Sequence, residues 1–139
     1  LVMMYSDKPS LKNDFVRPFI IETEITDSMA GVVRLALTNI KKAHDYLCEN
    51  EQKKAAKKLY TRTHLISFVP LAYEADNTET LAEFVKWFFT PEKRGVSISR
   101  VYNAHCSCSS NSPYAVEMRD RELRNYYKEF VGGGKNETN

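Results

Sequence analysis

Five histidine and cysteine side chains have the types and spacing that could bind a metal ion. They are His44 and Cys48, four residues apart, and the close trio His105, Cys106 and Cys108. Zinc takes a tetrahedral set of nitrogen and sulfur ligands, which the trio would complete if it folded onto the helix predicted around residue 44. The Cys-x-Cys spacing differs from the usual Cys-x₂-Cys, and His44 falls within an apolar stripe. We therefore expect a core histidine, a loop of free thiols and no metal.

Arg119 is the second candidate, because it falls between Val116 and Leu123 among the apolar positions of a predicted helix. A guanidinium keeps its charge in proteins, so a buried one needs an anion or carbonyl groups as partners. We expect either an internal ion pair or contact with the carboxyl end of a helix; an arginine that reaches the surface or holds a phosphate is the alternative. The carboxylates closest to apolar elements are Glu22, Glu24 and Glu74.

Nucleophilic catalysis has little support in the sequence. Three cysteines and three histidines are present, but no nucleophile elbow or papain-like context surrounds them. The glycine-rich motifs that hold nucleotide phosphates are also missing from the sequence. We therefore expect no catalytic residue, no cofactor and no enzymatic activity from this chain alone.

The most apolar stretch, residues 65–73, predicts the element around which the others pack. Only Ser67 interrupts it with a polar side chain, and a segment that is apolar on every side must be covered on every side. It is far shorter than the roughly 20 residues that span a bilayer. Thr61 precedes it as an N-cap candidate, and Pro70 fits a kinked helix better than a central strand. We predict a buried helix over residues 62–75.

Two further helices follow from apolar residues at helical spacing. The first covers residues 28–49 with Asp27 or Ser28 as its N-cap, and the second covers residues 79–89 with Thr78 as its N-cap. The residues predicted to share the buried face of the first are Met29, Val33, Ala36, Leu37, Ile40, His44 and Leu47.

The last helix has the clearest start signal. Ser112 at the N-cap and Pro113 at the first helical position predict a helix over residues 113–131. Residues 96–102 alternate in polarity, which fits a strand or a short helix, and residues 105–113 read as a long polar loop. The apolar positions of the last helix are Val116, Leu123, Tyr126, Tyr127 and Phe130.

Composition and chain order together predict an all-α domain. The chain has 139 residues, a net charge of +2 and no glycine between residues 32 and 94, whereas strand-rich folds need frequent turn residues. We expect an irregular lead-in over residues 1–26, in which Pro18 keeps the chain extended or in short turns. A single helical domain over residues 27–131 then forms an irregular bundle of about five helices around a buried central helix. Residues 132–139 are expected to be a disordered tail.

Two surfaces could serve a partner. Trp87 and Phe89 flank the core stripe of their helix, so they are expected either in the core or at an interface for a partner or a missing domain. Residues 49–58 carry paired lysines, which we interpret as a solvated helix face, because no aromatic residue is interleaved for stacking on bases.

Four segments of the sequence resemble a known family. Residues 60–71 read YTRTHLISFVPL and residues 84–89 read FVKWFF; Tyr102-Asn103 and residues 116–119 follow. These segments resemble the helical region after the ParB/sulfiredoxin-like domain in bacterial restriction and phage-defence proteins of the GmrS/GmrD type. The likeness covers about residues 40–130. The family's Asp-Gly-Gln-Gln-Arg motif and its H-N-H nuclease do not occur here, so no catalytic residue carries over.

The resemblance implies a non-catalytic helical accessory domain of a prokaryotic defence or restriction protein. Such a domain would contact its own missing N-terminal catalytic domain, another protein or DNA, and it would be cytoplasmic with no membrane contact. A small independent protein-interaction adaptor and a zinc-dependent nucleic-acid-binding module are the alternatives from other functional classes.

Overall fold

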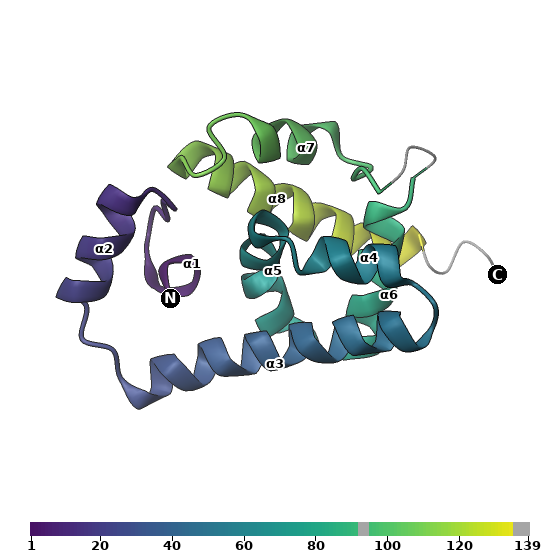
Figure 1. The fold of residues 1–139 in the computed structure, drawn as a ribbon, viewed down its shortest axis with the longest axis horizontal. Helices are drawn as coiled ribbons and strands as arrows, with labels where there is room; N and C mark the ends of the chain where they lie inside the picture. Colours follow the sequence, from purple (N-terminus) through teal and green to yellow (C-terminus); the bar gives the residue numbers. More distant parts are fainter. Residues whose placement is uncertain (92–94, 135–139) are drawn as a thin grey trace.

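The computed structural model describes residues 1–91 and 95–134, and every regular element in this part of the chain is helical (Figure 1). The all-α prediction is confirmed, although the helices are more numerous than the five or so expected. A π-helical turn, η1 (Phe130–Gly134), continues the last helix. The α-helices are α1 Val2–Tyr5, α2 Asn13–Glu22, α3 Asp27–Glu49, α4 Lys53–Leu59, α5 Arg62–Glu74, α6 Thr78–Phe89, α7 Arg100–Ser107 and α8 Pro113–Glu129.

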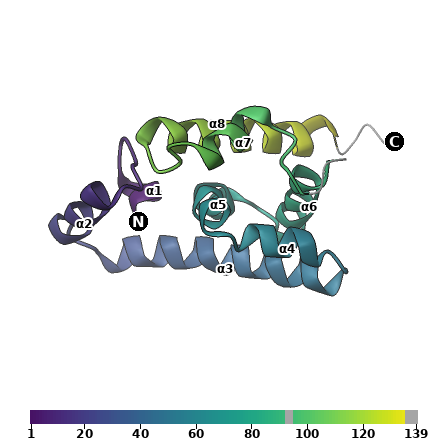
Figure 2. The ribbon, with the colours of Figure 1, turned by 45° about the horizontal axis from the view of Figure 1, so that its top comes forward.

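Helix α5 lies in the middle of the molecule. Figure 2 shows it nearly end-on, with α3 on one side and α7 and α8 on the other. Seven of its 13 residues are buried, so the prediction of a covered central helix is confirmed. Pro70 lies inside α5 without ending it. The missing hydrogen bond costs about 3 kcal/mol, and burial of several large apolar side chains, each worth about 1.5–3 kcal/mol, exceeds that cost.

Aromatic rings from α5 and α6 form the centre of the core. The ring of Phe68 is fully buried and lies 6.2 Å from Phe84, 6.4 Å from Phe88 and 5.8 Å from Phe89 between centroids. Tyr102 of α7 meets Phe88 edge-on at 5.1 Å. Rings tilted or edge-on at these distances attract one another beyond the area that they bury. This cluster therefore fixes α5, α6 and α7 relative to one another.

The lead-in expected to be irregular contains two helices, α1 and α2, which is a correction to the sequence analysis. Pro18 lies within α2. Its ring removes the hydrogen bond that the carbonyl of Asp14 would accept, but residue 14 is exposed, so water can take the place of the missing donor. Val2 and Leu11 pack with Val116 in a second apolar cluster, which joins the lead-in to α8.

Two helices begin at different caps from those predicted. The hydroxyl of Thr26, not Asp27 or Ser28, accepts from the Met29 amide at 3.1 Å at the start of α3. Asn77, not Thr78, caps α6 by accepting from the Glu79 and Thr80 amides at 2.8 and 3.1 Å. A cap residue needs an extended backbone just before the first turn, and Thr26 and Asn77 have it.

The segment before α8 is more helical than predicted. Ser99 caps α7 by accepting from the Tyr102 amide at 3.0 Å, so the strand alternative for residues 96–102 is wrong. His105 and Cys106 lie on α7, and the loop begins only at Cys108. The predicted cap of α8 is confirmed, because Ser112 accepts from the Ala115 amide at 3.2 Å. Residues 132–134 belong to η1 and not to a tail, while residues 92–94 and the rest of the tail lie outside the described residues.

Candidate functional site

Arg119 is the most deeply buried charged side chain in the described part of the chain, with 1% of its surface exposed. Its Nε donates to the hydroxyl of Ser67 at 2.9 Å. Its Nη1 donates to the carbonyl of His105 at 2.5 Å and to the carbonyl of Ser110 at 2.7 Å. The hydroxyl of Ser67 in turn donates a hydrogen bond to the carbonyl of Thr63 at 2.6 Å. Arg119 of α8 is thereby tied to α5, α7 and the loop after α7.

The partners of Arg119 are two carbonyl groups and a hydroxyl. Of the two buried arrangements expected from the sequence, this is the contact with the carboxyl end of a helix and not the ion pair. His105 lies in the last turn of α7, where helix carbonyls have no partner within the helix. The carboxyl end of a helix carries partial negative charge, so the guanidinium compensates that charge and satisfies an orphan acceptor. Burial lowers the pKa of Arg119, yet its ordinary pKa is so high that the group stays charged at neutral pH.

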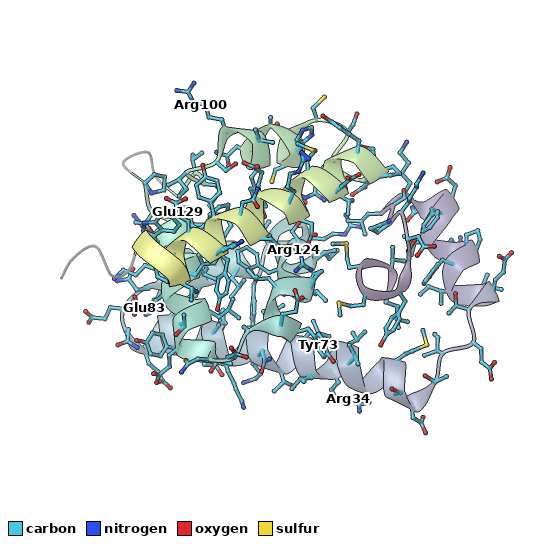
Figure 3. The ribbon with its side chains drawn as sticks, turned by 180° about the vertical axis from the view of Figure 1, so that it is seen from behind. Arg34, Tyr73, Glu83, Arg100, Arg124 and Glu129 are labelled. Carbon is cyan, nitrogen blue, oxygen red and sulfur yellow. The ribbon has the colours of Figure 1, made fainter. Side chains whose placement is uncertain are left out.

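The carboxylates named as partners of Arg119 are not its partners in this structure. Glu74 instead accepts from Arg124 on the outer face of α8, and Asp120 accepts from the same guanidinium at 3.0 Å (Figure 3). Glu22 and Glu24 are exposed beyond the buried site. Sequence distance misled the prediction because the neighbours of a buried side chain are set by helix packing.

His64 and Tyr102 extend the polar network towards α6. The Nδ1 of His64 lies 2.8 Å from the hydroxyl of Tyr102. Burial, with the positive charges of Lys58 and Arg119, lowers the pKa of His64 to about 4, so the imidazole is neutral at pH 7. Burial likewise raises the pKa of Tyr102 well above its usual value. Tyr102 therefore donates its proton and His64 accepts it.

Cys106 is chemically quiet in this setting. Burial raises the pKa of its thiol, and the nearby charge of Arg119 offsets that rise only in part. Since the thiolate is the nucleophile and the metal ligand, a thiol that stays protonated is a poor candidate for either role. The constellation of His64, Ser67, Tyr102, Cys106 and Arg119 is thus a set of satisfied core hydrogen bonds.

The zinc candidates do not gather into a metal site. Among the described residues, no group of three or more histidine, cysteine, aspartate or glutamate side chains could hold a metal ion. His44 and Cys48 do meet, with Nε2 and Sγ 3.8 Å apart. The half-buried ring of His44 stacks on Tyr60 at 3.7 Å, so it lies at the edge of the core and not in its apolar stripe. Cys106 lies on α7, and Cys108 is exposed at its end.

The aromatic residues considered for an interface occupy the core. Phe89 is 2% exposed and belongs to the ring cluster around Phe68. Trp87 is half-buried, and its ring lies 5.3 Å from Phe130 and 6.2 Å from Tyr126. Of the two alternatives, core or interface, Phe89 therefore belongs to the core. Trp87 packs on the core with one side and remains partly exposed on the other.

Sequence reasoning missed two open grooves among the described residues, and both are concave surfaces that could receive a partner. One, of about 480 Å³, runs along the first half of α3 beside Leu1 and Ile25. The other, of about 1250 Å³, lies along α4 and the end of α6. The lysine pairs of residues 53–58, interpreted from the sequence as a solvated helix face, line the second groove.

The fold and the site together describe an all-helical domain whose buried polar side chains form hydrogen bonds between helices. No family model, curated protein or solved structure matches the chain. In the described residues, no helix is both long enough and apolar enough to cross a membrane.

Proposed function

We propose that the chain is a non-catalytic helical accessory domain that contacts the catalytic domain of a prokaryotic defence or restriction protein. The observation that carries the proposal is the outer face of α2, where Ile20 and Ile21 are exposed while Phe15, Val16 and Phe19 on the same helix pack against the second apolar cluster. Neighbouring exposed apolar side chains of this kind mark a surface that a partner can cover. The resemblance of residues 40–130 to proteins of the GmrS/GmrD type is the basis for naming the kind of partner.

Exposed apolar side chains occur on α2 and in the segment that connects it to the first groove. Ile21 is 79% exposed, and Ile20 on the same helix is also exposed. Ile25 follows in the connection to α3, and together with Leu37 it borders the groove of about 480 Å³. Exposed apolar patches beside a groove mark protein interaction sites. An apolar surface also suits a protein partner better than the phosphates of nucleic acid.

The interior supports a non-catalytic role. The side chains with chemical potential, His64, Tyr102 and Cys106, are neutral at pH 7 and lie in the core or at its edge. His64 and Tyr102 form a hydrogen bond with each other, and the nearby Arg119 donates to Ser67 and to the carbonyl of His105. Removing any one of them is therefore expected to affect stability before any activity.

A photo-crosslinking residue at position 21 tests the proposal in the intact protein, expressed in its native cell from its complete reading frame. We expect Ile21 replaced by benzoylphenylalanine to crosslink to residues of the catalytic domain, outside residues 1–139. The control places the same residue at Arg100, which projects from α7 on another part of the surface (Figure 3).

Crosslinks from position 21 that do not exceed those from position 100 would contradict the proposal. Crosslinks that join a separate chain of one defined mass would support the independent adaptor instead. Ile20→Asp, introduced beside the photo-crosslinking residue at position 21, is expected to lose the crosslinked product while keeping the melting temperature, because the Ile20 side chain is exposed and contributes little to the core.

A further inference from the structure

The second groove, here called the α4 groove, lies at the opposite end of the molecule from α2 (Figure 1). Helix α4 forms one wall, and the end of α6 with Gly95 forms the other. Its described lining residues are Glu51, Gln52, Lys53, Lys54, Ala55, Lys57, Lys58, Thr61, Phe89, Thr90, Pro91 and Gly95.

The wall formed by α4 is strongly basic. Four lysines, Lys53, Lys54, Lys57 and Lys58, line the groove beside one acidic residue, Glu51. The ion pairs found among the described residues involve none of these lysines. The whole chain has a net charge of only +2, whereas the described lining of this groove alone has four lysines and one glutamate. Such local fields attract anionic partners and speed their association.

The opposite wall and the floor are partly apolar. Phe89 at the end of α6 and Ala55 of α4 are nearly buried at the base of the groove, and Pro91 is half-buried beside them. Gly95 has a φ of +74°, and a Cβ there would lie 3.1 Å from the side chain of Lys58, so the backbone approaches that lysine closely. The amide of Ile98 donates to the carbonyl of Phe88 at 3.1 Å and secures the segment that follows. Because these apolar residues are largely covered, the exposed lysines are the main groups that the groove offers to a ligand.

The dimensions favour a polymer. Pockets for small ligands hold about 300–1,000 Å³, and this groove is larger, at about 1250 Å³. Lysines four residues apart on a helix are separated by about 6 Å along its axis. The phosphates of a nucleic-acid strand also recur at regular intervals along its backbone. The pairs 53 with 57 and 54 with 58 therefore present cations at a regular spacing along the groove, where they can contact successive phosphates of one strand.

We propose that the α4 groove binds a single strand of nucleic acid, with the exposed lysines of α4 on its phosphates. A flat lipid surface does not fit a concave groove. An acidic peptide would present carboxylates without the regular spacing of a sugar–phosphate chain. The inference depends on the α4 groove alone. It does not depend on the contact proposed for α2.

Fluorescence anisotropy with short labelled single-stranded DNA and RNA, each of mixed sequence, tests the inference on the full chain. Lys54→Gln/Lys57→Gln removes two exposed lysines of the groove and keeps good helix formers. Lys8→Gln/Lys12→Gln is the matched control, because it removes the same charge from exposed positions at the other end of the molecule. Circular dichroism melting checks that both variants fold like the parent.

We expect the groove variant to bind at least about tenfold more weakly at low salt, and the control variant to bind within about twofold of the parent. The plot of log affinity against log salt between about 50 and 200 mM should become shallower by about 1.4, since each lost phosphate contact on a single strand contributes about 0.7. The DNA and RNA arms then show which strand is preferred.

Equal weakening in both double variants would overturn the inference, because it would show attraction to net charge without a site. An unchanged salt slope in the groove variant would overturn it as well. Polyglutamate and anionic phospholipid vesicles serve as competitors. If either displaces the oligonucleotide at an equal concentration of negative charge, the groove takes another class of partner.

Discussion

Arg119 shows how one buried charge can decide the packing of several helices. Arg119→Met keeps much of the stem and removes the three donors, leaving Ser67 and the carbonyls of His105 and Ser110 without their partner. Each buried group left unsatisfied costs about 1–3 kcal/mol. We expect the free energy of unfolding to fall by about 3 kcal/mol in urea titrations.

Arg121→Met is the control for that measurement, because Arg121 is exposed on the same helix and its one described contact is with Met118. It should change the unfolding free energy by less than about 0.5 kcal/mol. If Arg119→Met is as stable as the parent and loses binding to nucleotide or nucleic acid instead, the arginine serves a ligand and the structural interpretation is wrong.

His64 makes stability depend on pH in a defined window. The pKa of His64 is about 4 in the folded protein and about 6.5 in an unfolded chain, so the unfolded state binds the additional proton between these values. Stability is therefore complete above pH 6.5 and falls as the pH drops towards 4. From pH 7 to pH 5 the loss should be about 2 kcal/mol, at 1.36 kcal/mol for each pH unit below 6.5.

Urea unfolding at pH 7 and pH 5 measures this effect, and His64→Gln provides the comparison. The variant can be less stable at both pH values, yet the difference between them should shrink by most of the 2 kcal/mol or so assigned to the histidine. A difference that is as large in His64→Gln as in the parent would assign the pH dependence to other groups.

At the scale of elements, α5 is stabilised by burial of seven of its 13 residues. Phe68 is fully buried among rings of α6, so Phe68→Ala should cost about 3–5 kcal/mol of unfolding free energy. Tyr73→Ala on the same helix is the control; Tyr73 is 38% exposed and should cost less than about 1.5 kcal/mol. Thermal and urea unfolding would show the contrast. If the two variants lose similar amounts of unfolding free energy, Phe68 is no more deeply buried than Tyr73, and the central position of α5 is wrong.

Helices α2 and α4 are the opposite case, because much of their surface faces solvent. Helix α2 exposes apolar side chains, and α4 exposes lysines on one face while Ala55, Ala56 and Leu59 pack inward. The different chemistry of the two exposed faces is the reason for assigning a protein to one and a nucleic acid to the other.

At the scale of the whole molecule, α3 separates the two proposed surfaces. Its first half borders the apolar groove beside α2, and its second half packs on α4 (Figure 2). The crosslinking test at position 21 and the binding test of Lys54 and Lys57 therefore report on surfaces that share no lining residue. A protein that carries both would hold a nucleic-acid strand at one end and a partner domain at the other.

The sequence by itself determined the features that follow from local pattern. Residues 65–73 are apolar throughout and had to be central; Ser112 and Pro113 begin α8 because their side chains suit its first turn. The spacing around Arg119 also required a buried cation with polar partners. These conclusions depend on periodicity and capping, which act over a few residues.

The tertiary structure alone decided which distant groups meet. It joined Arg119 to the carboxyl end of α7 and not to the glutamates named from the sequence, because helix packing sets that neighbourhood. Helix α2 continues through Pro18, because the carbonyl of Asp14, which loses its donor there, belongs to an exposed residue and can bind water instead. The tertiary structure also turned the lysines of α4 into the wall of a groove, since a groove needs a second wall, and α6 supplies it from about 30 residues further along the chain.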